Sequence, residues 1–183
     1  ESPRVSRVIL VSPVPACDLG PEWEGADEVT AAGADLVSSV RAGLARTCDP
    51  AAPVLTVAGD LPFLSSAAVT DFLERCSTRP QASVWYGFMR REVSEQRFPG
   101  VRHTWARLVE GTFCGTGLVA LRPEVAERMQ QALRDLTQGR KNPLRLAATL
   151  GWRTILAFTL RRLTVPLAEE AARRLLGVPC AGI

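Results

Sequence analysis

An aspartate follows a short apolar segment in the first third of the chain. Residues 53–58 (PVLTVA) have the composition of a buried strand, and Gly59 and Asp60 come directly after them. Ligands of open α/β sheets bind beyond the carboxyl ends of the strands, so a carboxylate at this position can meet a substrate. Mg²⁺ takes few protein oxygens and keeps water and substrate oxygens as its other ligands. Two interpretations stay open, Asp60 as a metal-binding residue or as a residue that caps the following turn.

Two glycines precede another apolar segment in the second half of the chain. The run from Gly115 to Ala120 (GTGLVA) matches the glycine spacing of dinucleotide-binding loops, which require a helix to begin at that point. Residues 118–121 instead have the composition of a strand, so we reject a dinucleotide site. Because glycine permits close approach of the backbone, we expect Gly115 and Gly117 to lie against a ligand or a neighbouring strand.

Basic residues gather in the polar segment that follows residue 88. Arginine guanidinium groups suit phosphate oxygens, and a solvated charged surface is the alternative for any one of them. The arginines of this segment are Arg90, Arg91, Arg97, Arg102 and Arg107. We select Arg97 and Arg102 as candidate phosphate-binding residues. Lys141, the only lysine, stands just before an Asn-Pro pair that can begin a helix, and it is a third candidate.

Composition excludes several classes of protein. The formal net charge of +3 is too small to indicate binding to nucleic acid or to a membrane surface, and no apolar run approaches the roughly 20 residues of a membrane helix. The five cysteines are scattered, which argues against a zinc cage or a disulfide framework and favours the cytoplasm. No G-x-S-x-G motif occurs, and we expect the only histidine, His103, to be a surface or packing residue.

Apolar segments alternate with amphipathic segments along the chain. Strands are predicted at 7–12, 53–58, 82–88 and 118–121, with a hairpin-like insertion around 101–121 that turns at 110–111. Helices are predicted at 35–47, from Ser65 or Ser66 to about 76, from 123 to about 137, at 142–150, at 152–163 (where a strand is the alternative) and at 164–176. This alternation predicts a single α/β domain, residues 1–183, with a mainly parallel sheet.

Three segments carry a resemblance to a known family. They are GDLPFLSSAAVTDFL at 59–73, RFPGVRHTWARLVEGTFCGTGLVALRPE at 97–124 and RKNPLRLAATLGW at 140–152. These segments resemble the MobA-like NTP transferases, nucleotidyltransferases related to the molybdenum-cofactor guanylyltransferase, and the resemblance covers about residues 7–177. It implies a three-layer α/β/α fold of the nucleotide-diphospho-sugar transferase type, and it implies that Asp60 binds Mg²⁺ or Mn²⁺.

The chain departs from the family pattern at two places. The family begins with a strand and a glycine-rich L-x-G-G-x-G-x-R-M loop followed by a Lys, whereas the first strand of this chain resembles the family's second. Relatives carry Gly-Gly-Asn where this chain has Gly115, Thr116 and Gly117. We therefore expect a domain that lacks the first strand and the glycine-rich loop, either because the lineage has lost them or because they stand outside these 183 residues. We also expect weak or undetectable triphosphate binding by these residues alone.

The resemblance implies an enzyme that transfers a nucleoside monophosphate from a nucleoside triphosphate to a phosphate or hydroxyl of a small-molecule acceptor. Asp60 is then the catalytic and metal-binding residue. The expected substrate-binding residues are Arg97, Arg102, Lys141, Gly115 and Gly117. We expect a cytoplasmic protein without a nucleic-acid or membrane partner, and the sequence leaves the acceptor, the base and the oligomeric state open.

Two alternatives remain beside this function. The first is a catalytically degenerate domain of the same fold that binds a nucleotide or a protein without turnover. The second is a metal-dependent sugar transferase, which is disfavoured because residues 59–62 (GDLP) contain no Asp-x-Asp pair.

Overall fold

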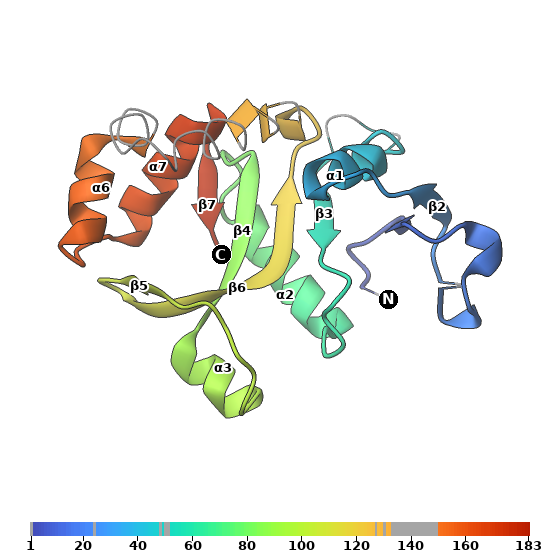
Figure 1. Cartoon of the computed structure of the whole chain (residues 1–183), viewed down its shortest axis with the longest axis horizontal. Coiled ribbons are helices and arrows are strands. Elements are labelled where there is room, and N and C mark those ends of the chain that lie inside the picture. Colours follow the sequence, from blue (N-terminus) through green and yellow to red (C-terminus); the bar gives the residue numbers. More distant parts are fainter. Residues whose placement is uncertain are drawn as a thin grey trace.

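The computed structural model describes residues 2–23, 25–47, 49, 52–126, 128–129, 131–132 and 150–183 (Figure 1). The first half contains β1 (Ile9–Ser12), β2 (Glu28–Ala31), α1 (Leu36–Leu44), β3 (Val54–Val57), α2 (Ser66–Ser77) and β4 (Val84–Arg90). The second half contains α3 (Arg91–Arg97), β5 (Ala106–Leu108), β6 (Gly111–Leu121), α6 (Trp152–Thr159), α7 (Val165–Leu176) and β7 (Cys180–Gly182). Short 3-10 turns lie at Ala16–Asp18 and Pro21–Trp23. The mixed α/β class is confirmed.

The central sheet has the strand order β3–β6–β4–β7, and β5 pairs with the first part of β6. β6 runs antiparallel to β3, β4 and β5, whereas β7 runs parallel to β4. β1 and β2 form a separate parallel pair. The prediction of a mainly parallel sheet is therefore wrong for every pair that contains β6, although β3, β4 and β7 run in the same direction. The cause is the turn after β5, because it reverses the chain and β6 then continues without a break between β3 and β4.

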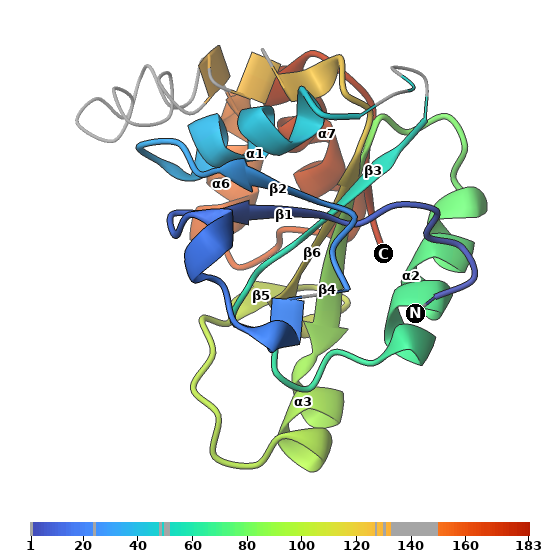
Figure 2. The ribbon, with the colours of Figure 1, turned by 90° about the vertical axis from the view of Figure 1, so that its right-hand side faces the viewer.

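Helices pack against both faces of this sheet (Figure 2). On one face, Phe72 and Cys76 of α2 pack with Trp85, Ala120 and Ala181. On the other face, residues of α1 and α7 and of the helical turns that begin at residue 125 pack around Val84 and Leu121. Successive strand residues point to opposite faces, so neighbouring residues such as Val84 and Trp85 serve different clusters.

The helix ends lie close to the predicted bounds. The Asp35 carboxylate accepts a 2.7 Å hydrogen bond from the backbone N–H of Ser38 and begins α1. Ser65 rather than Ser66 begins α2, and Thr164 begins α7. Gly177 ends α7 with a φ of +67°, the left-handed conformation that glycine adopts without strain.

Besides the two 3-10 turns, three described elements were not predicted. β2 and β7 are short strands, and α3 is a polar helix in the arginine-rich segment. The predicted helix at 142–150 lies outside the described residues except for Leu150. The helix predicted from residue 123 is seen at residues 125–126, 128–129 and 131–132, and its expected end at about 137 is also outside them.

Candidate functional site

Asp60 stands on an exposed turn just beyond the carboxyl end of β3. Within the described part of the chain its carboxylate has no hydrogen bond and no ion pair. The start of this turn is anchored to β6, because the backbone N–H of Ala58 donates a 3.1 Å hydrogen bond to the carbonyl of Gly117. A carboxylate held on an anchored turn without a protein partner is free to accept a ligand or a solvated ion.

Gly117 lies directly against the turn that carries Asp60. Its φ is +75°, and a Cβ atom added to it would lie 3.0 Å from Leu61 Cδ1 and 3.2 Å from Ala58 Cβ. The close approach predicted for this glycine is thus made to the Asp60 turn. The structure brings these two predicted site residues together although 57 positions separate them in the sequence.

Gly115 has a different neighbour. A Cβ atom added to Gly115 would overlap the hydroxyl oxygen of Tyr86, so the missing side chain makes room for the end of the Tyr86 side chain. The pairing register between β4 and β6 shifts between Tyr86 and Phe88. Such irregularities change the direction of nearby side chains and are over-represented next to active sites. Sequence analysis did not select Tyr86, because its contact with Gly115 depends on the pairing of distant strands.

The arginines of the segment 90–107 divide into two groups. Arg90 donates to the Glu110 carbonyl at 3.0 Å and lies over the Phe113 ring, while Arg91 pairs with Glu95 at 2.7 Å. These two guanidinium groups are therefore engaged by other residues of the fold. Three others are exposed and have no partner within the described residues: Arg97, Arg102 and Arg107. Both candidates selected from this segment therefore belong to the unpaired group.

An aromatic contact connects the end of α3 to the Asp60 turn. The rings of Phe63 and Phe98 are stacked with their centroids 5.8 Å apart. Phe98 follows Arg97 directly, so this contact brings Arg97 toward the turn. Arg102 lies further along the segment that leads to β5, and no contact ties it to the turn. Lys141 lies outside the described residues.

These segments together form what we call the Asp60 edge, which consists of residues 58–63, 115–117 and 97–98. No group of three or more His, Cys, Asp or Glu side chains in the described residues could hold a metal ion. One unpaired carboxylate still fits Mg²⁺, which accepts one or two carboxylates and fills its remaining positions with water and phosphate oxygens. Asp60 is the residue of this edge that would hold such an ion.

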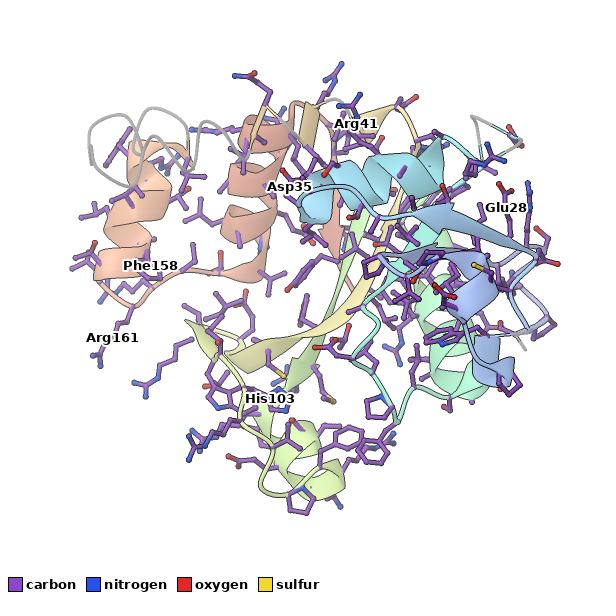
Figure 3. The ribbon with its side chains drawn as sticks, turned by 45° about the vertical axis from the view of Figure 1, so that its right-hand side comes forward. Glu28, Asp35, Arg41, His103, Phe158 and Arg161 are labelled. Atoms are coloured by element: carbon purple, nitrogen blue, oxygen red, sulfur yellow. The ribbon has the colours of Figure 1, made fainter. Side chains whose placement is uncertain are left out.

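Other reactive side chains are placed differently. His103 lies between α3 and the β5–β6 hairpin, with its ring centroid 5.3 Å from that of Trp105, as expected for a packing residue (Figure 3). Burial raises the pKa of the Cys76 thiol to about 11, and burial followed by the charge of Glu169 raises that of Cys180 to about 11. These two thiols are protonated at neutral pH and are poor nucleophiles.

A second polar region lies at the opposite edge of the sheet. This region, the α7 pocket, is a surface depression whose lining includes Arg79, Glu169, Glu170, Arg173 and Cys180. Glu169 pairs with Arg79 at 3.1 Å and accepts a 2.8 Å hydrogen bond from the backbone N–H of Gly182. The charged groups of the α7 pocket therefore join α7 to β7 and to the end of α2.

The fold is similar to that of a solved protein described as a hypothetical transferase from Thermus thermophilus. The TM-score is 0.73 and the sequence identity 31%, over 87% of this chain and 67% of that chain. This chain belongs to the family of that transferase. No protein-family model matches the chain, and no curated protein is significantly similar to it.

Membership of this family supports a transferase fold for the chain and indicates an enzyme. About a third of the Thermus thermophilus transferase lies outside the matched part, so the activity of that whole protein comes to this chain only as a proposal. None of the helices in the described residues has the length and apolar composition needed to cross a bilayer.

Proposed function

We propose that this member of the transferase family is a Mg²⁺-dependent nucleotidyltransferase of the MobA-like type. An oxygen of a phosphate or hydroxyl acceptor attacks the α-phosphorus of a nucleoside triphosphate. The bond from the α-phosphorus to the oxygen that bridges it to the β-phosphorus breaks, and pyrophosphate leaves with that electron pair. A hydroxyl acceptor loses its proton to solvent. Such a transfer depends mainly on positioning the phosphates and neutralising their charge.

The observation that carries this proposal is the unpaired Asp60 carboxylate on a turn anchored by Gly117. A bound Mg²⁺ would supply positive charge next to the phosphates. Arg97 is the cation that the Phe63–Phe98 contact brings toward this turn. Guanidinium groups without a protein partner keep their hydrogen-bond donors for phosphate oxygens.

The prediction of a three-layer α/β/α domain is part of the same proposal. Among the described strands, β1 pairs only with β2 and β3 pairs only with β6, so each has one free edge. Residues 54–56 of β3 and 9–11 of β1 are only half-buried although their composition is that of buried strands. A further strand carrying a glycine-rich loop would satisfy such free edges and would complete a three-layer domain.

The test is thermal unfolding of the full-length protein with Mg²⁺ and each nucleoside triphosphate. Ligand at about 100 times its dissociation constant stabilises a protein by about 2.7 kcal/mol, which corresponds to a rise of roughly 5–10 °C in the melting temperature of a chain of this size. We expect this rise in the wild type and its loss in Asp60→Asn.

The matched control is Glu124→Gln, because Glu124 is another exposed carboxylate without a partner in the described residues. This variant should keep the full rise. An equal rise in wild type and Asp60→Asn would remove Asp60 from the site. Binding without pyrophosphate release, tested across phosphate and hydroxyl acceptors, would favour the degenerate nucleotide-binding domain instead.

A further inference from the structure

The helix α6 presents apolar side chains to solvent. Trp152 is 67% exposed, Leu156 48% and Phe158 69%, whereas the buried residue of this helix is the polar Thr154. Leu160, which caps the C-terminal end of α6, is 57% exposed. A helix on the surface of a globular protein normally turns its apolar residues inward. The inverted pattern of α6 indicates a surface that another partner covers.

The apolar surface continues from the C-terminal end of α6 to the turn of the β5–β6 hairpin. The carbonyl of Leu163 accepts a 2.8 Å hydrogen bond from the N–H of Val109 in that turn, and Val109 is 62% exposed. We call residues 158–162 together with Val109 the α6 corner. α6 and the hairpin turn lie at one end of the longest axis of the molecule, where an extended surface can reach them (Figure 1).

Arg161 occupies a position in this corner that normally belongs to glycine. Its N–H donates to the Phe158 carbonyl at 3.1 Å, and the N–H of Arg162 donates to the Ala157 carbonyl at 2.7 Å. This pair of hydrogen bonds ends helices at a left-handed residue, as Gly177 does after α7. Arg161 has a φ of +53° and is the only non-glycine residue with a positive φ among those that the structure describes. A strained backbone under an exposed arginine, whose side chain points away from the molecule in Figure 3, indicates a use for that side chain.

The α6 corner concentrates positive charge. Residues 150–168 contain no acidic residue but three arginines, Arg153, Arg161 and Arg162. All three are exposed and have no partner within the described part of the chain. The carboxylate of Glu110 in the hairpin turn is engaged elsewhere, because it accepts hydrogen bonds of 3.0 and 3.1 Å from the N–H of Val165. The net charge of +3, from which no membrane partner was expected, is an average that hides this local excess.

We propose that the α6 corner binds the surface of an anionic lipid bilayer. Phe158 and Leu160 enter the headgroup region, and Arg161 and Arg162 pair with lipid phosphates. Exposed apolar residues beside arginines are the combination that holds proteins at an anionic membrane interface without crossing it. This inference goes beyond the proposed function, because it concerns a surface outside the Asp60 edge.

Two observations favour a bilayer over a protein partner. Leu156 and Phe158 are two positions apart and lie on nearly opposite sides of α6, so the apolar residues surround the helix. A groove of another protein receives a single apolar stripe instead. A second copy of this chain, bound through the same corner, would bring arginines against arginines without a carboxylate from residues 150–168 to pair them.

The first test is flotation of the full-length protein with two kinds of vesicle, phosphatidylcholine alone and phosphatidylcholine mixed with an equal amount of phosphatidylglycerol. We expect binding to the anionic vesicles only, and a loss of about five-fold in the partition coefficient for Arg161→Gly. Glycine suits the backbone at this position, so the melting temperature of this variant should not fall. Arg75→Ser removes an exposed positive charge from α2 and should bind like the wild type. Unchanged binding by Arg161→Gly would overturn the inference.

The second test concerns the apolar part of the α6 corner. Phe158 is largely exposed, so Phe158→Ser should leave the melting temperature unchanged and weaken binding to the anionic vesicles by at least about five-fold. Wild-type protein that binds neither kind of vesicle, or both equally, would overturn the inference. Binding to polyglutamate that Arg161→Gly loses, without binding to vesicles, would assign the corner to an acidic protein segment. Self-association that Phe158→Ser abolishes, again without binding to vesicles, would assign it to a second copy, and either result would overturn the membrane proposal.

Discussion

The α7 pocket and the Asp60 edge both contain charged groups, but they differ in what those charges contact. In the α7 pocket, Glu169 pairs with Arg79 and Glu170 pairs with Arg173. At the Asp60 edge, Asp60 and Arg97 have no such partner within the described residues. Charges that neutralise each other inside the fold contribute to its stability. Charges left without a partner beside an anchored turn can interact with a ligand instead, so the two regions should respond differently to substitution.

The largest effect on stability is expected when a substitution breaks the pairing in the α7 pocket. Glu169→Ala removes the partner of Arg79 and leaves the N–H of Gly182 without its acceptor. Hydrogen bonds to charged groups contribute about 1.5–3 kcal/mol, and we expect a loss of this size in the free energy of unfolding. Urea unfolding measures it, as a lower midpoint with an unchanged slope.

Glu95→Ala is the matched control for this prediction. Glu95 also pairs with an arginine, but its side chain is 55% exposed on the surface of α3. Exposed pairs four residues apart contribute only about 0.3–0.5 kcal/mol. Asp60→Asn should change the stability of the ligand-free protein by less than about 0.5 kcal/mol. A loss in Asp60→Asn as large as that in Glu169→Ala would show that the carboxylate at the Asp60 edge also serves the fold.

The second prediction concerns the glycines of the Asp60 edge. Gly117→Ala places a side chain at a φ of +75°, which costs about 1–2 kcal/mol, and crowds Leu61. Gly59→Ala is the control, because a Cβ atom added there has nothing within 4 Å and no positive φ is imposed. Chemical denaturation should separate the two variants by at least about 1 kcal/mol. Equal stability would mean that Gly117 does not hold the Asp60 turn.

Gly117→Asn refines that comparison. Asparagine adopts the left-handed conformation more readily than alanine, so this variant should be less destabilised than Gly117→Ala. The MobA-like NTP transferases, which this chain resembles, carry Asn at this position. If the proposed function is correct, Gly117→Asn should bind Mg²⁺–nucleoside triphosphate at least as tightly as the wild type in the melting assay.

Local patterns in the sequence were sufficient for most elements that carry an apolar stripe or a capping residue. The strand that leads to Asp60 and the helices that begin after Asp35, Ser65 and Thr164 were predicted because each depends on neighbours within a few positions. α3 was missed because it is polar on all sides and is supported by the Arg91–Glu95 pair rather than by an apolar face.

Pairing between distant strands could not be predicted in the same way. Residues 118–121 have the composition of a buried strand in either direction, and only the reversal after β5 makes β6 antiparallel to both neighbours. The contacts of Gly117 with Leu61 and of Gly115 with Tyr86 depend on that pairing. Asp60 was selected from its local sequence and from the family resemblance. Tyr86 had no local sequence signal that distinguished it from the other residues of its strand.

The smallest expected effect concerns Glu170 at the rim of the α7 pocket. Side-chain hydrogen bonds from Arg173 and then Arg174 lower the pKa of this carboxyl group from 4.5 to about 2. A carboxylate with a lowered pKa adds stability that is complete above its ordinary pKa and is lost as the pH falls toward the lowered value. The difference in melting temperature between wild type and Glu170→Gln should therefore be largest above pH 4.5 and should shrink toward pH 2. Because these side chains are exposed, added salt should reduce the difference at every pH. A difference that is constant from neutral pH to pH 2 would mean that Glu170 acts through packing and that its charge is not part of the pairing in the α7 pocket.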